Sequence, residues 1–223
     1  MSAPFRTALL AVGGVLSGLS IAGVAIGGFV LSSYGSETTS WTEIPAEVTN
    51  LVVTAAPGTS VSISDYGQVP DAGVRLNAGG NTLWSEIPAM QLTVSGNTAT
   101  VTVSAVNPAR AVPDFSELQL DPGNRRWESI AVSTSSGAYI ALAAADSISV
   151  TTNELGYITV VPQLPLPTSI TLQGPAAQVL LPDDSGPVSV EMPQGCDLAV
   201  PNATDAPTLI RILGGCAAIE RTN

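Results

Sequence analysis

The second half of this chain repeats short apolar pairs, in which two apolar residues are separated by a single residue. Nine such pairs recur between residues 130 and 212, and their starts are 8 to 12 residues apart. The segments between them are short and rich in Gly, Pro, Asn, Asp and Ser, which is typical of turns. Residues at i and i+2 of a strand point to the same face, so we expect both members of each pair to be buried together. The pairs are Ile130/Val132, Ile140/Leu142, Ile148/Val150, Ile158/Val160, Ile170/Leu172, Val179/Leu181, Val188/Val190, Leu198/Val200 and Ile210/Ile212.

This regular spacing favours a β-solenoid or β-roll-like domain, in which each coil would hold two strands and about 20 residues. In a β-sandwich the spacing usually varies more, because some connections cross between sheets, and the sandwich stays open as the alternative. Alternating runs also precede the repeat, at residues 49–55, 60–65 and 73–77, followed by a hairpin at 90–104 with Gly96-Asn97 at its turn. The sequence therefore predicts an all-β domain over residues 48–223.

The only two cysteines of the chain, Cys196 and Cys216, are 20 residues apart, which is the length of one expected coil. Equivalent positions in neighbouring coils would lie about 4.7–4.9 Å apart, within the range of about 4.4–6.8 Å between Cα atoms that a disulfide accepts. We therefore expect a Cys196–Cys216 disulfide near the C-terminal end of the sheet. The alternative is two buried free thiols.

A different pattern occupies the N-terminal part, where residues 8–31 carry no charge and only Ser17 and Ser20 are polar. As a helix these residues would be about 36 Å long, enough to cross a hydrocarbon layer of about 30 Å. The pattern predicts a cytoplasmic leader at 1–7, a transmembrane helix at 8–31 and a juxtamembrane linker at 32–47. Cleavage of the segment after Gly35 stays open.

Small residues in this predicted helix are spaced for close packing against another helix. Gly14 and Gly18, and again Gly23 and Gly27, match the small-xxx-small pattern that lets two helix backbones approach. This predicts a helix partner in the membrane or a homodimer. Arg6 precedes the segment and Glu37 is the first charge after it, so the positive-inside rule places the N-terminus inside and the C-terminal domain outside a cell membrane crossed once.

The charges exclude several classes of function. The chain has a formal net charge of −11, no His, and only seven Lys and Arg residues against 18 Asp and Glu residues, so it should repel nucleic acid. The residues that usually support catalysis are also missing. All seven basic residues are arginines, and a chain without His or Lys lacks the usual bases that activate a nucleophile. Asp184-Ser185-Gly186 resembles an aspartic-protease tripeptide, but no second copy supplies a partner carboxylate. We therefore expect no enzyme activity, cofactor or metal, and leave open a weak calcium site at Asp183 and Asp184.

The longest connection without a clear strand pattern runs from residue 107 to residue 127 and concentrates positive charge in an otherwise acidic domain. Arg110, Arg125 and Arg126 lie in it. Long connections carry binding residues more often than short turns do, so these arginines are the predicted contact surface. The alternative is that they pair with acidic residues of the same connection.

Several stretches resemble a known family, the bacterial membrane-anchored "putative adhesin" proteins of unknown function. They are "SETTSWTEIPAEVTNLVVTAAPGTSVSIS", "VSGNTATVTVS", and "ESIAVSTSSGAYIAL" followed by "DSISVTTNELGYITV". The resemblance implies a short basic leader, one transmembrane helix and an outer β-solenoid. The resemblance bears on fold and topology more than on function. With enzyme classes excluded above, we expect a surface-displayed, non-enzymatic interaction protein, adhesin-like or a scaffold, with a protein or cell-surface partner. The alternative is a carbohydrate-binding or polysaccharide-active module, which the distribution of exposed aromatic side chains would distinguish.

Overall fold

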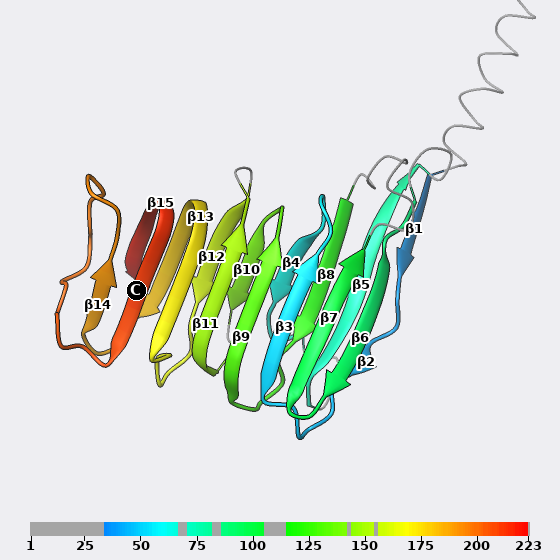
Figure 1. The fold of residues 1–223 in the computed structure, drawn as a ribbon, viewed down its shortest axis with the longest axis horizontal. Coiled ribbons are helices and arrows are strands. Elements are labelled where there is room, and N and C mark those ends of the chain that lie inside the picture. Colours follow the sequence, from blue (N-terminus) through cyan, green and yellow to red (C-terminus); the bar gives the residue numbers. More distant parts are fainter. Residues whose placement is uncertain are drawn as a thin grey trace, which may run out of the picture.

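The computed structural model describes residues 34–66, 71–81, 86–104, 115–141, 144–153 and 156–222. In these ranges all strands belong to one 15-stranded sheet, which curls so that two rows of strands face each other across the core (Figure 1). The strands are β1 (Tyr34–Thr38), β2 (Thr42–Glu43), β3 (Asn50–Ala55), β4 (Ser60–Ile63), β5 (Gly73–Asn81), β6 (Ala89–Ser95), β7 (Thr98–Ser104), β8 (Phe115–Asp121), β9 (Trp127–Thr134), β10 (Ala138–Ala141), β11 (Ala145–Thr152), β12 (Tyr157–Val161), β13 (Ser169–Pro182), β14 (Val188–Glu191) and β15 (Thr208–Thr222).

We call the two rows the front row and the back row. The front row runs β6-β7-β3-β9-β11, then the first halves of β13 and β15, and ends at β14. The back row runs β1-β5-β8-β4-β10-β12, then the second halves of β13 and β15. Most neighbours in both rows are parallel and in register, whereas β6 pairs with β7, and β5 with β1, β2 and β8, in the antiparallel sense.

The core lies between the rows and is built from the predicted apolar pairs. Parallel register aligns Ile130, Ile148, Ile170 and Ile210 on successive front strands, and all four are buried. The prediction that both members of a pair are buried together is confirmed for seven of the nine pairs, which lie in β9, β11, β12, β13, β14 and β15. Of the other two pairs, Leu142 lies outside the described residues, and Leu198 is partly buried beside the buried Val200.

The predicted fold class, a transmembrane helix followed by a β-solenoid, is wrong. The described residues contain no helix, and therefore none that could cross a membrane. The leader and the predicted span at 8–31, with Gly14, Gly18, Gly23 and Gly27, lie outside the described residues. The predicted linker at 32–47 holds β1 and β2, and both pair with β5.

The described strands also depart from a solenoid in their order. A solenoid stacks its coils in the order of the sequence. Here β3 lies between β7 and β9 in the front row, and β4 lies between β8 and β10 in the back row. At the other end β15 lies between β13 and β14. Moreover, β13 and β15 each pass through both rows as one strand, so the rows form a single curled sheet rather than the two sheets of a sandwich.

Candidate functional site

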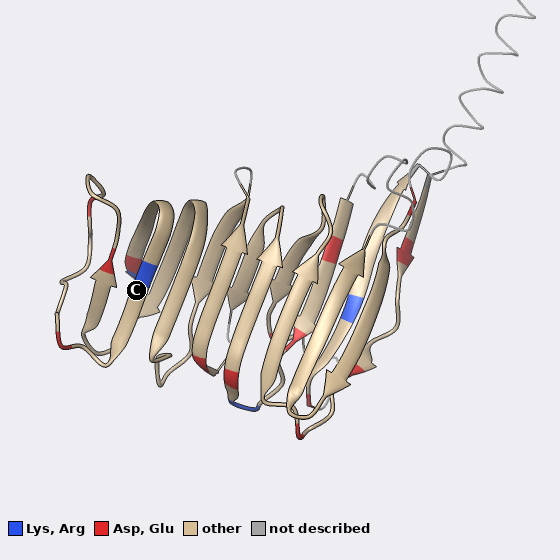
Figure 2. Cartoon of the chain, in the orientation of Figure 1, with Lys and Arg blue, Asp and Glu red and all other residues tan. Residues whose placement is uncertain are grey.

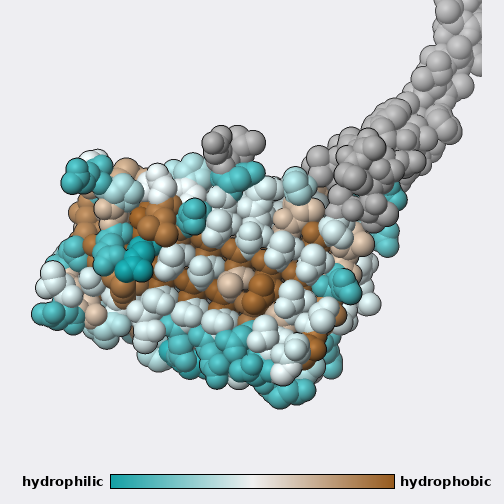
Figure 3. Space-filling view, in the orientation of Figure 1, coloured by the Kyte–Doolittle hydropathy of each residue, from teal (hydrophilic) through white to brown (hydrophobic). Residues whose placement is uncertain are grey.

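The outer surfaces of the two rows differ in the side chains that they carry. The described outward positions of the front row are mostly Ser and Thr and hold no aromatic residue. Figure 3 shows this face as largely weakly polar, with hydrophobic residues visible between the weakly polar ones. Figure 2 shows charged residues mainly near strand ends and turns on this side. The back row instead carries aromatic residues on its outer surface, namely Trp41, Tyr66, Phe115, Tyr139 and Tyr157.

Two tyrosines protrude from neighbouring strands of the back row. Tyr139 of β10 is 45% exposed and Tyr157 of β12 is 49% exposed. Their neighbours Ala138, Ile140 and Ile158 are buried, so strand alternation turns both rings outward. Large exposed aromatic side chains on a sheet surface otherwise built from small polar residues mark this surface as a candidate contact site.

A shallow depression lies between these tyrosines. Its lining includes both rings together with Ser60, Ser62 and Glu117. The parallel register places Gly137 between Ser60 of β4 and Tyr157 of β12, so no side chain fills the floor of the depression at that point. Two tyrosines and three polar side chains therefore border an open floor.

A hydrogen-bond network fixes the polar side of the depression. The Tyr66 hydroxyl donates to Ser62 Oγ at 2.7 Å, and Gln119 Nε2 donates to Glu117 Oε2 at 2.7 Å. Arg75 Nε donates to Gln119 Oε1 at 2.7 Å. Because their neighbours hold Ser62 and Glu117, less side-chain entropy remains to be lost when a ligand binds them.

Aromatic stacking continues the network at the β5 end of the back row. The guanidinium of Arg75 lies 4.7 Å from the centre of the Trp41 ring, and the centres of the Trp41 and Tyr66 rings are 5.6 Å apart. Partial burial raises the pKa of the Tyr66 hydroxyl above its usual value, so this group stays a neutral donor at physiological pH. The indole N–H of Trp41 is buried without an acceptor among the described residues.

The turn at Asp183 and Asp184, the candidate calcium site, is occupied by an arginine. Arg221 Nη1 donates to the carbonyl oxygen of Ser185 at 2.7 Å, to Ser185 Oγ at 2.8 Å and to the carbonyl oxygen of Asp183 at 3.2 Å. Two carbonyl oxygens and the Ser185 hydroxyl of this turn therefore already accept from a guanidinium, which brings positive charge to the turn. In the described ranges, no group of three or more acidic, Cys or His residues is placed to hold a metal ion.

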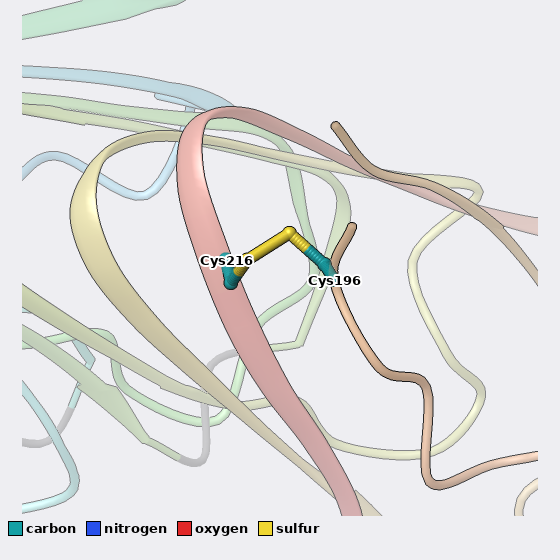
Figure 4. Close-up of a disulfide and its surroundings, with 2 residues drawn as sticks. All are labelled: Cys196 and Cys216. Carbon is teal, nitrogen blue, oxygen red and sulfur yellow. A yellow bond between two sulfur atoms is a disulfide. The ribbon is translucent and has the colours of Figure 1, made fainter. Parts of the chain in front are cut away.

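The predicted disulfide between Cys196 and Cys216 is present. It joins β15 to the segment after β14, and the two Cα atoms are 5.4 Å apart (Figure 4). This distance is close to the spacing of adjacent strands, as expected from the separation of the cysteines by one repeat. The bond ties the outermost segment of the C-terminal end to the sheet.

Two of the three arginines of the predicted contact surface have partners within the chain. Arg125 Nη1 donates to the Pro45 carbonyl oxygen at 2.7 Å, and its guanidinium lies 4.3 Å from the centre of the Trp127 ring. Burial lowers the pKa of Arg125 from its ordinary value. Arg126 forms an exposed ion pair with Asp146 at 2.7 Å, whereas Arg110 lies outside the described residues. A contact role for these three arginines stays a prediction.

Sequence reasoning missed the tyrosine surface. Tyr139 and Tyr157 are 18 residues apart and were not singled out, although each adjoins a predicted buried residue. That adjacency was the available signal, because the neighbour of a buried strand residue points outward. It could not show that the two rings share one surface, since this depends on the pairing of β10 with β12.

Comparison with solved structures supports the fold. The chain is similar to a structure described as a putative cell adhesion protein from Clostridium sporogenes, with a TM-score of 0.55 and 14% identity over 84% of this chain and 98% of that chain. It also matches putative adhesins from Bacteroides fragilis (TM-score 0.35, 9% identity, 85% and 97% coverage) and Parabacteroides distasonis (TM-score 0.31, 9% identity, 85% and 97% coverage). No family model matches the chain, and neither does any curated protein. At 14% identity, the similarity to the Clostridium sporogenes structure shows a shared fold. It supports the resemblance inferred from the sequence as far as the fold is concerned.

Proposed function

We propose that this protein is a non-enzymatic, adhesin-like interaction module that binds its target through the outer surface of the back row. The observation that carries the proposal is the pair of exposed tyrosines, Tyr139 and Tyr157, which both border the depression whose floor is at Gly137. Tyrosine supplies a large, rigid contact area at low entropic cost, which is why it is common in binding surfaces. The adhesion-related name of the structurally similar protein from Clostridium sporogenes agrees with this role.

The chemistry of the depression favours a neutral carbohydrate chain as the target. A sugar ring presents C–H faces that can pack on the tyrosine rings, and hydroxyl groups that can bond to Ser60, Ser62 and Glu117. The net charge of −11 opposes a polyanionic ligand, and the depression is too shallow to enclose a small molecule on all sides. An open groove of this kind suits a polymer that passes across it.

The disulfide supports a location outside the cytoplasm. Structural disulfides form and persist in oxidising compartments, and Cys196–Cys216 joins two cysteines 20 residues apart in the chain. A carbohydrate ligand would be met there, on the surface of a cell or in the surrounding matrix.

A binding screen tests this proposal. The full chain, purified in mild detergent, is mixed with insoluble chitin, cellulose, starch and β-1,3-glucan, and the bound fraction is measured after washing. We expect retention on at least one of these polymers, weakened at least tenfold by Tyr157→Ala and little changed by Leu164→Ala, which removes an exposed apolar side chain elsewhere. Retention on none of them, or equal retention of Tyr157→Ala, would overturn the carbohydrate proposal, and capture of a protein instead would favour the other partner class.

A further inference from the structure

Within the described residues the front row ends at β6, one side of which has no paired strand. β6 pairs with β7 along its whole length, from Ala89 opposite Ser104 to Ser95 opposite Thr98. No described residue pairs with its other side. A strand at the edge of a sheet presents a row of free N–H and C=O groups, which natural proteins usually protect with charged residues, proline or a covering segment.

β6 carries none of the usual protecting residues. Its sequence, AMQLTVS, contains no charge and no proline. Met90 and Leu92 pack against the core but are only partly buried, and Val94 is 40% exposed. The apolar side of β6 therefore continues the core to the end of the front row without being fully covered by described residues.

The opposite end of the front row is protected. Asn202 lies against the outer side of β14, where its Oδ1 accepts from the Val190 N–H at 2.9 Å and its Nδ2 donates to the Val190 carbonyl oxygen at 3.2 Å. The Ala203 N–H also donates to the Val188 carbonyl oxygen at 3.0 Å. Among the described residues, these edge groups of β14 therefore have hydrogen-bond partners, whereas the edge of β6 has none.

The geometry of the hairpin shows which groups of β6 are free. Ser95 and Thr98 flank the two-residue turn at Gly96-Asn97, and in such hairpins the flanking residues exchange both backbone hydrogen bonds. Alternation then turns the N–H and C=O groups of Met90, Leu92 and Val94 away from β7. These are the groups that a further strand would bond.

We propose that the β6 edge pairs with β6 of a second copy of this chain, antiparallel and centred on Leu92. In this register Leu92 lies opposite Leu92 of the second copy, Met90 lies opposite Val94, and Gln91 lies opposite Thr93. Apolar residues then meet apolar residues on the inner side and polar residues meet polar residues on the outer side, with about six new backbone hydrogen bonds. No like charges are brought together, because β6 has none.

This contact forms a closed dimer rather than a fibre. The same edge is used by both copies, so the interface is isologous and leaves no free copy of it. Asn202 blocks strand addition at the other end of the front row. The dimer is independent of the proposed carbohydrate site, which lies on the back row.

Sedimentation velocity of the full chain in mild detergent, over a hundredfold range of concentration, tests the dimer. We expect a monomer–dimer equilibrium for the natural chain, and a loss of dimer of at least tenfold in Thr93→Lys, which places a charge on the outward side of the edge. Ser149→Lys makes the same kind of change at an exposed position in the middle of the front row and should leave the dimer intact. A monomer at every concentration, an equal dimer in Thr93→Lys, or growth beyond the dimer would overturn the proposal.

Cysteine cross-linking tests the register. Both natural cysteines are in the disulfide, so a new cysteine would be the only free thiol. Under mild oxidation Leu92→Cys should link two chains, because position 92 lies opposite itself. Thr93→Cys lies opposite Gln91 and should link at least fivefold less. Equal linking at both positions would contradict the proposed register even if a dimer forms.

Discussion

The front and back rows share one scaffold but differ in what they present outward. In the front row, Val52, Ala131, Ser149 and Thr171 occupy successive outward positions. The corresponding line in the back row holds Ser62, Tyr139, Thr159 and Gln178, next to Tyr157. Apart from β6 at the end of the front row, the described inward positions of both rows are mostly buried and apolar. Inward residues therefore determine the fold, and outward residues are free to carry function, which we propose for the back row.

If inward positions are equivalent in the two rows, charges placed there should be equally damaging. Ile148→Asp in the front row and Ile158→Asp in the back row would each bury an unpaired carboxylate at a fully buried site. We expect each to cost several kcal/mol of unfolding free energy, about 3–5, enough to prevent stable folding. Urea unfolding followed by circular dichroism measures the effect, with the outward Ser149→Asp as the control that stays close to the natural stability. A large difference between the two rows would break the equivalence.

The next largest effect concerns the C-terminal end, where the disulfide holds the segment after β14 to β15. Replacing both cysteines, Cys196→Ser with Cys216→Ser, should lower the unfolding free energy by about 3 kcal/mol, because the loop that the bond closes gains freedom mainly in the unfolded chain. Thermal unfolding with and without reductant checks this value. The natural chain should fall to the stability of the double variant when it is reduced, and an unchanged midpoint would contradict a stabilising role.

The two neighbouring arginines should differ from each other. Arg125→Ala removes the hydrogen bonds to the Pro45 and Ile44 carbonyl oxygens and the stacking on Trp127, so we expect a loss of about 1–3 kcal/mol. The Pro45 carbonyl oxygen keeps the Val48 N–H as a donor at 3.1 Å. Arg126→Ala removes an exposed ion pair and should cost less than about 1 kcal/mol. Chemical denaturation of both variants gives the comparison. If Arg126 instead has the larger effect on stability, the assignment of Arg125 to the support of the loop at Ile44 and Pro45 is wrong.

The buried positions of the strands could be predicted from the sequence, whereas the order of the strands and the surface that they form could not. Strand alternation identified residues such as Ile148 and Ile158 as buried, and the spacing of Cys196 and Cys216 predicted their bond, because both signals are local or follow the repeat. The order of the strands is decided by long-range pairing. No local sequence pattern shows that β15 lies between β13 and β14 instead of following β14 in the sheet. The solenoid, which requires the sequential order, was therefore predicted wrongly.

The candidate site was hidden for the same reason. The polar side chains of Ser62, Glu117 and Gln119 come from β4 and β8, which pair with each other although their residues are more than 50 positions apart in the chain. Their proximity to Tyr139 needs the pairing of β4 with β10 in addition. Composition indicated few aromatic residues, but only the register shows that they gather on one surface.

The central claim is that the back row, and not the front row, binds the target. The most direct test is isothermal titration calorimetry with a soluble oligosaccharide of the polymer retained in the screen, using two matched double variants of the full chain. Tyr139→Ser with Tyr157→Ser alters the back row, and Val52→Ser with Leu213→Ser removes exposed apolar side chains from the front row. We predict that the back-row variant loses at least a hundredfold in affinity while its unfolding free energy changes by less than about 1 kcal/mol, and that the front-row variant binds as the natural chain does. Equal affinity of the natural chain and the back-row variant, or a loss confined to the front-row variant, would contradict this account.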